Sequence, residues 1–425
     1  MNLKRFFVLF VSLLFLNLLS AEGKILAIED AVRLAKENNI SVKKAENNLD
    51  SLAVQNKYSW NSVSPAAKLN GNFEDDIEND STAFSLSGAV NLSLKTNLYS
   101  EIKDAKLNYE KGLLTYSEAV RQIELSVRKK FYNLIYQKEN LVLQNRSLET
   151  SRAQYLNNEE KFKNGKISEL DAFTSRVNYE SKKPVVESAE INFQNDLASF
   201  KQLLGIPQET EIALDGSLDD FLNLKEISFG LLPKVDEPAP DVKSAEYDVE
   251  IAKNSLLNLR FSAYAPVITG SYSYGKSKKS TQDDWMTTNQ LSVGVSVPLD
   301  GILPWSSSAV DIKKQKNALD TAEKNLEDAK TTVAVQTESY IRKINQAVKQ
   351  LDSLKSTEKL AEQTYKMTLA AYNYGKTDFL SLQNANDSVL SAGVNLKSQA
   401  YTLISTILDL ESVLGLEFGT LETKK

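Results

Sequence analysis

The chain has 425 residues and contains neither cysteine nor histidine. Without cysteine there are no disulfides, thiolate metal ligands or lipoprotein anchors, and without histidine there are no imidazole ligands and no histidine general base. The sequence also has no glycine-rich phosphate loop, and no motif places a pair of carboxylates around a pocket. We therefore expect a protein that is not an enzyme and that uses no metal and no cofactor.

A large excess of one charge is also missing. The chain has 50 basic and 56 acidic residues, a net charge of −6 and an isoelectric point near 5.2. Because lysine and arginine do not gather into a stripe, nucleic acid is not expected as a partner. The hydrophobic fraction of 42% is that of an ordinary folded protein.

A long apolar run occurs only at the N-terminus. Lys4 and Arg5 precede an apolar stretch over residues 6–19, and small residues follow at Ser20 and Ala21. This pattern predicts a signal peptide over residues 1–21, with a membrane anchor as the competing interpretation. No later stretch approaches the roughly 18 apolar residues of a spanning helix, so a mature chain that enters a bilayer must do so as β-strands.

The second half of the chain repeats the first. Six positions recur 210 residues later: Tyr155, Gly165, Lys166, Leu170, Leu204 and Gly205 match Tyr365, Gly375, Lys376, Leu380, Leu414 and Gly415. Such a period is too long for a solenoid unit and predicts two copies of one supersecondary assembly. We expect repeats over residues 22–205 and 241–415, an equatorial segment between them over residues 206–240, and a tail over residues 416–425.

Long helices dominate each repeat. Residues 97–162 contain no proline and one glycine, and apolar residues recur there at a spacing of seven: Val120, Val127, Leu134, Leu141, Leu148, Tyr155 and Phe162. This stripe predicts a coiled-coil helix of roughly 100 Å, and residues 307–374 are its counterpart. Helices over residues 168–203 and 378–414 follow a Gly-Lys turn, which predicts two antiparallel helical hairpins. Further helices are expected over residues 29–61 and 241–263, each ending before a proline.

Four short segments alternate between apolar and polar residues with a period of two. In one of them Phe84, Leu86 and Val90 share a face, while the intervening residues are small or polar. The segments form two hairpins, at about residues 66–95 and 267–299. The length of each segment is close to the ~10 residues with which a tilted strand crosses a bilayer. For a single hairpin the alternative is a soluble one that buries its apolar face on the helices.

Four strands in lipid would leave edge N–H and C=O groups unpaired, so the sheet must close with other copies. Two copies would give a barrel filled by side chains, and three would give twelve strands and a pore. The expected fold class is mainly α with a small β part. Long antiparallel coiled-coil helices form an α-barrel, and four transmembrane β-strands per chain complete a 12-stranded barrel in a trimer.

The tip motifs FKNGKIS (residues 162–168) and YNYGKTD (residues 372–378), together with the repeat ends LLG and VLG, resemble those of the TolC family of outer-membrane channel proteins. The resemblance also includes the strand starts after Pro65 and Pro266 and covers nearly the whole mature chain. It implies a homotrimer whose barrel lies in the lipid of the outer membrane and whose helices continue as a tunnel in the periplasm. It further implies a passive conduit that docks on a periplasmic adaptor (membrane fusion) protein and an inner-membrane pump or ABC transporter. The transport would be efflux of drugs and small molecules, or type I protein secretion.

The resemblance also implies an aperture at the periplasmic end. A tyrosine three residues before the second tip glycine and an aspartate six residues after the first close this end in the family, and here they are Tyr372 and Asp171. Where the family often has a basic and two acidic residues, this chain has Thr377, Ser381 and Asn384, so no ring of charge is expected. Asp378 is expected either to replace part of that charge or to cap a helix. The adaptor-docking residues implied at the tips are Asn164, Gly165, Lys166, Tyr374, Gly375 and Lys376.

A structural or adhesive coiled-coil protein of the periplasm or cell surface is the alternative function. The helices alone would suffice for it, and it predicts neither a detergent requirement nor any use for four alternating strands. The sequence leaves the cargo, the adaptor and the pump open.

Overall fold

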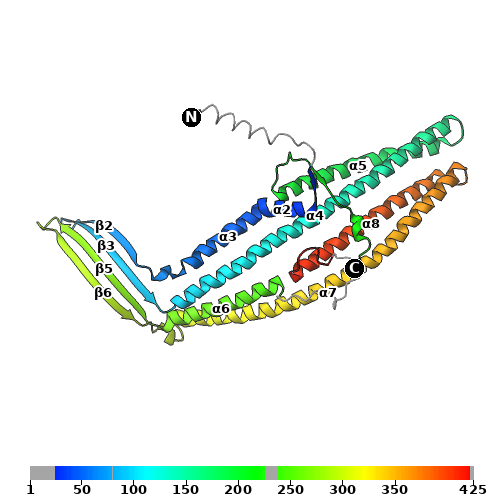
Figure 1. Cartoon of the computed structure of the whole chain (residues 1–425). Coiled ribbons are helices and arrows are strands. Elements are labelled where there is room, and N and C mark those ends of the chain that lie inside the picture. The colour runs from blue at the N-terminus through cyan, green and yellow to red at the C-terminus, as the bar shows by residue number, and fades with distance from the viewer. Residues whose placement is uncertain (1–23, 79, 225–237, 422–425) are drawn as a thin grey trace, which may run out of the picture. The chain divides into compact units, whose positions relative to one another are not determined.

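The computed structural model describes residues 24–78, 80–224 and 238–421 (Figure 1). The chain divides into two compact units. The first comprises Met1–Lys43, Glu118–Pro238 and Ala334–Lys425, and the second comprises Lys44–Ser117 and Ala239–Val333. The expected signal peptide and residues 225–237 of the expected equatorial segment lie outside the described residues.

The first unit contains two helical hairpins, which are α4 with α5 and α7 with α8. Its elements are β1 (Lys24–Leu26), α2 (Ile28–Asn38), the later part of α4 (Leu98–Lys163), α5 (Glu169–Leu204), β4 (Ile212–Leu214), the short 3-10 helix η2 (Leu218–Phe221), the later part of α7 (Ser307–Asn373) and α8 (Phe379–Leu414). Figure 1 shows both hairpins turning at the same end of this unit. Long helices therefore make up most of the unit, as the sequence predicts.

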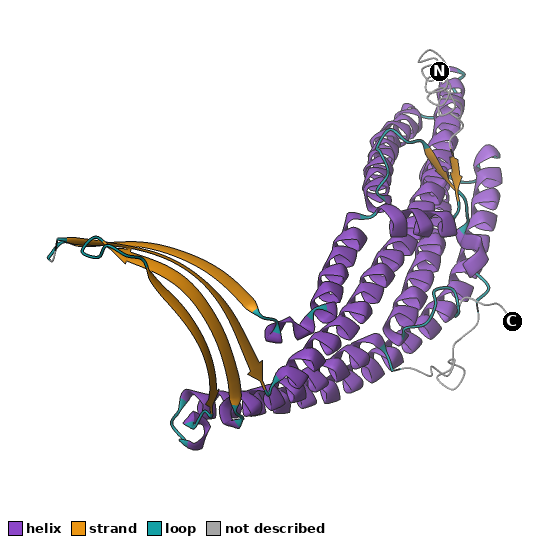
Figure 2. Ribbon diagram, turned by 60° about the vertical axis from the view of Figure 1, so that its left-hand side comes forward, coloured by secondary structure: helices purple, strands orange, loops and turns teal. Residues whose placement is uncertain are grey.

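The second unit contains one four-stranded sheet and the helices next to it. Its elements are most of α3 (Ile40–Lys57), η1 (Ser59–Val63), β2 (Ala66–Asp76), β3 (Ser81–Lys95), the first parts of α4 and α7, α6 (Pro240–Tyr264), β5 (Val267–Lys279), β6 (Met286–Ser296) and η4 (Asp300–Ile302). The strands lie in the order β2-β3-β5-β6, as labelled in Figure 1, and are antiparallel throughout. Figure 2 shows the sheet in orange. The four strands predicted from the period of two are confirmed.

The pairing of β3 with β5 joins the two hairpins into one sheet. It runs from Ala83 opposite Lys279 to Lys95 opposite Val267. Each hairpin comes from one half of the duplicated chain, so the sheet is assembled from both repeats. Among the described residues, no helix is long and apolar enough to cross a membrane.

The apolar core of the first unit lies where the two helical hairpins meet α2 and the segment that follows α5. Its largest fully buried side chains include Phe131 on α4, Phe200 on α5, Ile344 on α7 and Leu403 on α8. The Phe131 and Phe200 rings pack with their centroids 6.3 Å apart. Such burial supplies the main favourable free energy of folding, so this region is expected to be the most stable part of the unit.

All four helices of the two hairpins end in the same way, at a glycine. The glycines are Gly165, Gly205, Gly375 and Gly415, each with φ between 67° and 72°. At each end the glycine N–H and the next N–H donate to carbonyls of the last turn, for example Gly165 N to Phe162 O at 2.8 Å and Lys166 N to Lys161 O at 2.8 Å. This is the Schellman motif, which needs a left-handed residue and therefore favours glycine.

Two of these glycines allow the cost of backbone strain to be separated from the cost of a steric clash. A Cβ at Gly205 would lie 2.7 Å from Asn38 O, whereas a Cβ at Gly165 would meet nothing within 4 Å. We expect Gly165→Ala to cost about 1–2 kcal/mol, from the left-handed backbone alone. Gly205→Ala should cost about 2–5 kcal/mol, because overpacking adds to the strain. The midpoint of thermal loss of helical circular dichroism, at one protein concentration, measures both. Equal shifts would show that α2 yields to the added methyl group.

The structure differs from the sequence prediction at residues 29–61. The predicted single helix is two helices, because the chain leaves helical geometry at Asn39, whose ψ is 130°. The Asn39 side chain donates from Nδ2 to Leu203 O at 2.8 Å and accepts at Oδ1 from Ser41 N at 2.7 Å. Asparagine side chains compete with the helical backbone for such bonds, and the tertiary partner at the end of α5 favours the break.

The seven-residue stripe on α4 is buried over only part of its predicted length. Val127, Leu134 and Leu141 are buried, but Leu148 and Tyr155 are half-buried and Phe162 is 40% exposed. A straight α-helix turns by about 20° per heptad relative to a strict seven-residue repeat, so such a stripe rotates out of an interface unless the helices supercoil. Beyond Leu141, the residues of α4 that are buried are neighbours of this stripe and not its own members.

Candidate functional site: the apolar sheet face and the helical tips

One face of the sheet is apolar and exposed to its surroundings. The register places Phe73 opposite Phe84, Val90 opposite Tyr272, and Tyr272 opposite Leu291. The large side chains of this face remain accessible: Leu69, Phe73, Leu291, Val293 and Val295 are each between 68% and 76% exposed. An apolar patch of this extent marks a surface that something else covers.

The opposite face of the sheet carries small and polar side chains. Thr269, Ser271 and Ser273 of β5 lie beside Gly294, Ser292 and Gln290 of β6. The hydroxyls of Ser271 and Ser292 are 2.6 Å apart and share a hydrogen bond. One face therefore suits an apolar environment and the other suits water.

The first unit presents two matched tips. The loops after Lys163 and Asn373 each have a left-handed glycine with open space around it. The tip residues predicted to dock an adaptor are all exposed, and Tyr374 is 80% exposed. They are Asn164, Gly165, Lys166, Tyr374, Gly375 and Lys376. Their docking role remains a prediction.

Each tip continues into a helix that has a side-chain cap. Ser168 Oγ accepts from Asp171 N at 3.1 Å and donates to Asp171 Oδ2 at 2.8 Å. Asp378 Oδ1 accepts from Ser381 N at 2.7 Å, and hydrogen bonds from the Ser381 side chain and backbone lower the pKa of Asp378. Both residues therefore satisfy N–H groups that the first helical turn leaves free.

Tyr372 joins the two helical hairpins close to the tips. Its hydroxyl donates to Asn158 Oδ1 at 2.7 Å, its ring packs edge-on against Phe379, and the Lys161 ammonium lies 4.7 Å from the ring centroid. Burial raises the pKa of Tyr372, the Asn158 hydrogen bond lowers it, and the negative charge of Asp171 raises it. Asp171 is thus within electrostatic reach of Tyr372, and a direct bond between the two remains a prediction.

Four polar side chains of α4 occupy the buried line between the hairpins near the tips. They are spaced by four, three and four residues, and none is more than 8% exposed: Ser147, Ser151, Gln154 and Asn158. We call this line the polar seam. It corresponds to the a and d positions of a coiled coil, which the apolar residues of α4 occupy farther from the tips.

The partners of the polar seam come from the other three helices of the two hairpins, α5, α7 and α8. Ser147 Oγ accepts from Lys182 Nζ at 2.8 Å and from Asn386 Nδ2 at 3.3 Å, and Lys182 also pairs with Asp387 at 2.8 Å. Gln154 Nε2 donates to the Tyr365 hydroxyl at 3.4 Å. The buried atoms Asn158 Nδ2 and Gln154 Oε1 have no hydrogen-bond partner in the described structure.

The seam and the core differ in how much they resist separation. Exposing buried apolar surface to water costs about 25 cal/mol of free energy per Å². Breaking a neutral hydrogen bond costs less, because water replaces the lost partner and the net contribution of the bond is about 1 kcal/mol. Of the two contact zones, the polar seam near the tips is therefore the weaker.

The remaining predicted aperture residues lie on or near the start of α8. Ser381 and Asn384 are exposed and Thr377 is half-buried. Their spacing of four and three residues places them along one side of the helix. None carries a charge, so any passage along this side would be neutral at these levels.

Sequence reasoning missed Asn158, Lys182 and the rest of the polar seam. A signal was present, because residues 147, 151, 154 and 158 have coiled-coil spacing. The sequence prediction followed the apolar residues Leu148, Tyr155 and Phe162 instead, which lie one to four residues from the polar seam. In the structure these three residues are less buried than the polar seam.

Comparisons with known proteins agree with this architecture. Residues 231–416 match the family model described as outer membrane efflux protein. The chain is 20% identical over 306 residues to outer membrane protein TolC of Vibrio cholerae serotype O1, covering 71% of this chain and 69% of that protein.

Solved structures with the same fold include two channels. The Campylobacter jejuni CmeC outer membrane channel aligns with a TM-score of 0.77 at 18% identity, over 91% of this chain and 85% of that one. The open state of the Neisseria gonorrhoeae MtrE outer membrane channel aligns with a TM-score of 0.70 at 18% identity, over 92% and 89%.

The fold of this chain is therefore that of these solved outer-membrane channels. Together with the family match and the Vibrio relative, this fold confirms the resemblance predicted from the tip motifs. The chain is thus similar in sequence and in fold to the TolC family of outer-membrane channel proteins.

Proposed function

We propose that this chain is the outer-membrane channel of a tripartite export system. Three copies would close their sheets into one twelve-stranded barrel in the outer membrane, with the helical part in the periplasm. The channel would be a passive conduit for drugs and small molecules or for secreted proteins, and an inner-membrane pump or ABC transporter would supply the energy. The proteins that the chain matches are described as efflux and channel proteins rather than enzymes.

The exposed apolar face of the sheet is the observation that carries the proposal. Leu69, Phe73, Leu291 and Val293 would be costly in water. Lipid would cover them at no cost, and closure into a barrel would pair the free edges of β2 and β6. A structural coiled-coil protein of the periplasm would have no use for such a face.

We further propose that the aperture lies at the tips and that an adaptor opens it there. Tyr372, Asp171 and the polar seam support this location, because they form the weaker of the two contacts between the helical hairpins. Thr377, Ser381 and Asn384 would line a neutral constriction, and Asp378 would cap α8. The exposed tip residues, with Lys166 and Lys376 beside the glycines, would meet the adaptor.

The native mass of the processed chain, extracted from membranes with detergent, tests the proposal. We expect a detergent-bound trimer that forms conducting pores when it is reconstituted in planar lipid bilayers. A monomer or dimer that stays in solution without detergent would leave the apolar sheet face without lipid. That result would favour the structural coiled-coil protein instead.

A further inference from the structure

The apolar face of the sheet becomes basic toward one end of β5. From the end at which the strands join the helices, the residues of β5 on this face are Ile268, Gly270, Tyr272, Tyr274, Lys276 and Lys278. Lys276 lies opposite Leu86, and Lys278 lies opposite Phe84. Two ammonium groups thus stand on the side that the proposed barrel turns toward lipid.

The height of the two lysines matches the edge of the hydrocarbon layer. Lys276 and Lys278 follow Ile268, the first apolar residue of β5 on this face, by 8 and 10 residues. At about 3.3 Å per residue and a tilt of about 40°, they lie roughly 20 and 25 Å from Ile268 along the membrane normal. The apolar band of an outer-membrane barrel is about 25 Å tall. The lysines therefore reach the headgroups of the outer leaflet.

Aromatic side chains accompany the lysines at this level. Phe84, Tyr274 and Trp285 are each between 45% and 49% exposed, and the rings of Phe84 and Trp285 pack edge-on with their centroids 6.0 Å apart. Tyrosine and tryptophan gather where a membrane meets water. A lysine beside them can lay its stem on apolar surface while its ammonium group reaches a headgroup.

Neither lysine is neutralised by the chain itself. In the described structure no carboxylate pairs with Lys276 or Lys278. Asp75 shares their face of the sheet, but it lies on β2, with β3 between it and β5. Two unpaired cations at the level of the headgroups attract an anionic headgroup, and phosphate is the anion that lipids commonly carry.

A hollow extends from Lys276 over the apolar face toward the helices. It has a volume of about 440 Å³, and its lining includes Leu69, Leu86, Val90, Tyr272, Tyr274 and Lys276. Gly88 leaves space in it, because a Cβ at this position would meet no atom nearer than 4.0 Å. A mostly apolar hollow that begins at a cation suits a lipid, whose acyl chain lies next to its charged headgroup.

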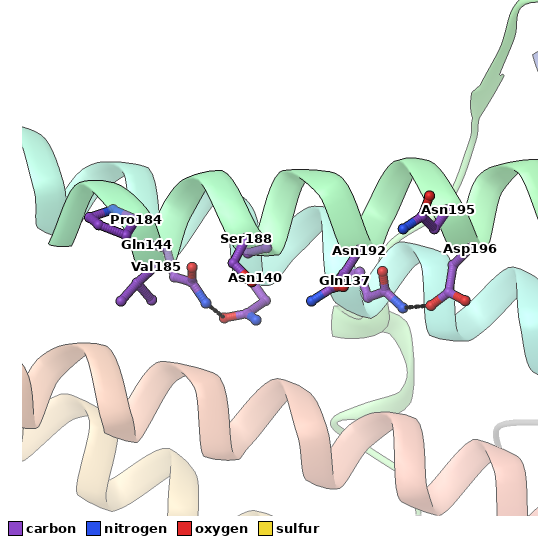
Figure 3. Close-up of a pocket in the computed structure, with 10 residues that line it drawn as sticks. Gln137, Asn140, Gln144, Pro184, Val185, Ser188, Asn192, Asn195 and Asp196 are labelled. Carbon is purple, nitrogen blue, oxygen red and sulfur yellow. Dashed lines mark hydrogen bonds between the residues drawn. The ribbon is translucent and has the colours of Figure 1, made fainter.

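The larger hollow on α4 and α5 lacks this combination. It has a volume of about 730 Å³, and Figure 3 shows its lining, which includes Gln137, Asn140, Gln144, Ser188, Asn192 and Asp196. None of the described residues that line it is basic, and Asp196, which accepts from Gln137 Nε2 at 2.5 Å, would repel a phosphate. Of these two hollows, the one on the sheet is therefore the one that fits an anionic lipid.

We infer that Lys276 and Lys278 bind the phosphate groups of an outer-leaflet lipid, one of whose acyl chains lies in the hollow beside Gly88. The inference rests on the proposed barrel and adds a lipid site to its outer surface. Because β5 lies between β3 and β6 in the sheet, each site belongs to a single chain, and a trimer carries three. The bound lipids hold the barrel at a fixed height in the membrane.

Native mass spectrometry of the detergent-extracted trimer tests the phosphate contact. The probes are diphosphoryl lipid A and the same lipid after both phosphates have been removed, each added to delipidated trimer. Lys276→Gln with Lys278→Gln removes both charges, and Lys276→Arg with Lys278→Arg keeps them. Lys279→Gln is the matched control, because Lys279 is the next residue of β5 and therefore points to the opposite face of the sheet.

We expect up to three diphosphoryl lipids per trimer for the natural chain, the double arginine variant and the control. The double glutamine variant should bind this lipid roughly 30-fold more weakly, because each lysine near an anionic lipid headgroup contributes to the attraction. Equal binding by the double glutamine variant, equal weakening by Lys279→Gln, or equal binding of the phosphate-free lipid would overturn the site and leave the proposed function standing.

Two further outcomes are decisive. If the double glutamine variant forms no trimer, the natural trimer still decides, because a site for phosphate must prefer the phosphorylated lipid. A monomeric or dimeric mass for the natural chain would remove the proposed function, and the inference with it.

Gly88→Leu tests the acyl-chain contact separately, because it fills the hollow without changing any charge. We expect it to weaken binding of diphosphoryl lipid A on the order of tenfold, which corresponds to about two methylene groups lost from the contact. Gly270→Leu is the control on the same face, because a Cβ there also meets open space but lies outside the hollow. Equal binding by the two glycine variants would overturn the hollow as the place of the acyl chain.

Discussion

In planar lipid bilayers, channels with Asp171→Ala and Tyr372→Phe are expected to be open far more often than channels of the natural chain. The double variant removes the Tyr372 hydrogen bond to Asn158 and the Asp171 charge near it. A neutral hydrogen bond contributes about 1 kcal/mol. Three symmetric copies would therefore shift the closed-to-open equilibrium by about 3 kcal/mol, which is on the order of a hundredfold in population.

The single variants separate the two possible links at the tip. If the Asn158 bond holds the hairpins together, Tyr372→Phe alone should reproduce the double variant and Asp171→Ala should have a smaller effect. Tyr365→Phe is the matched control one heptad farther from the tip, because its hydroxyl accepts only a long bond of 3.4 Å from Gln154. Unchanged conductance of the double variant would show that these residues do not hold the aperture closed.

Phe131→Ala is expected to cause the largest loss of stability of any single substitution proposed here, about 3–5 kcal/mol. The ring is 1% exposed and packs against Phe200, with Tyr132 at a centroid distance of 5.8 Å. Truncation would leave a cavity where both helical hairpins meet the segment that follows α5. Thermal unfolding followed by circular dichroism, together with the yield of trimer from membranes, measures the loss.

Val142→Ala is the control on the same helix. Val142 is 64% exposed, and substitutions at exposed positions usually change stability by no more than about 0.5 kcal/mol. Both variants must be compared at one protein concentration, because association of the copies contributes to the midpoint. Similar midpoints for the two variants would mean that the core around Phe131 collapses without penalty, or that the assembly and not this core limits unfolding.

Local rules account for the features that the sequence predicted well. The period of two in β3 and β6 specifies strands because alternate side chains point to opposite faces. Gly165, Gly205, Gly375 and Gly415 mark helix ends because the closing motif needs a left-handed residue. Asp378 caps the helix that follows it because its short side chain reaches a free N–H group of the first turn. All of these effects act within a few residues of the chain.

Contacts between residues far apart in the sequence were not predictable in the same way. The break at Asn39 depends on Leu203, which is 164 residues away, and β1 pairs with β4 across a similar separation. The Asn158 partner of Tyr372 likewise lies in the other half of the duplication. Separations of this size carry no local signal, since they depend on which elements pack together.

The sequence by itself therefore determined the duplication, the two kinds of secondary structure, the ends of the helices and the apolar face of the sheet. Only the tertiary structure decided which line of α4 is buried near the tips. Leu148, Tyr155 and Phe162 compete there with the polar seam, and the two lines differ by a small rotation of one helix about its axis. That rotation is set by the supercoil and by packing against three other helices, and no residue of α4 specifies it alone.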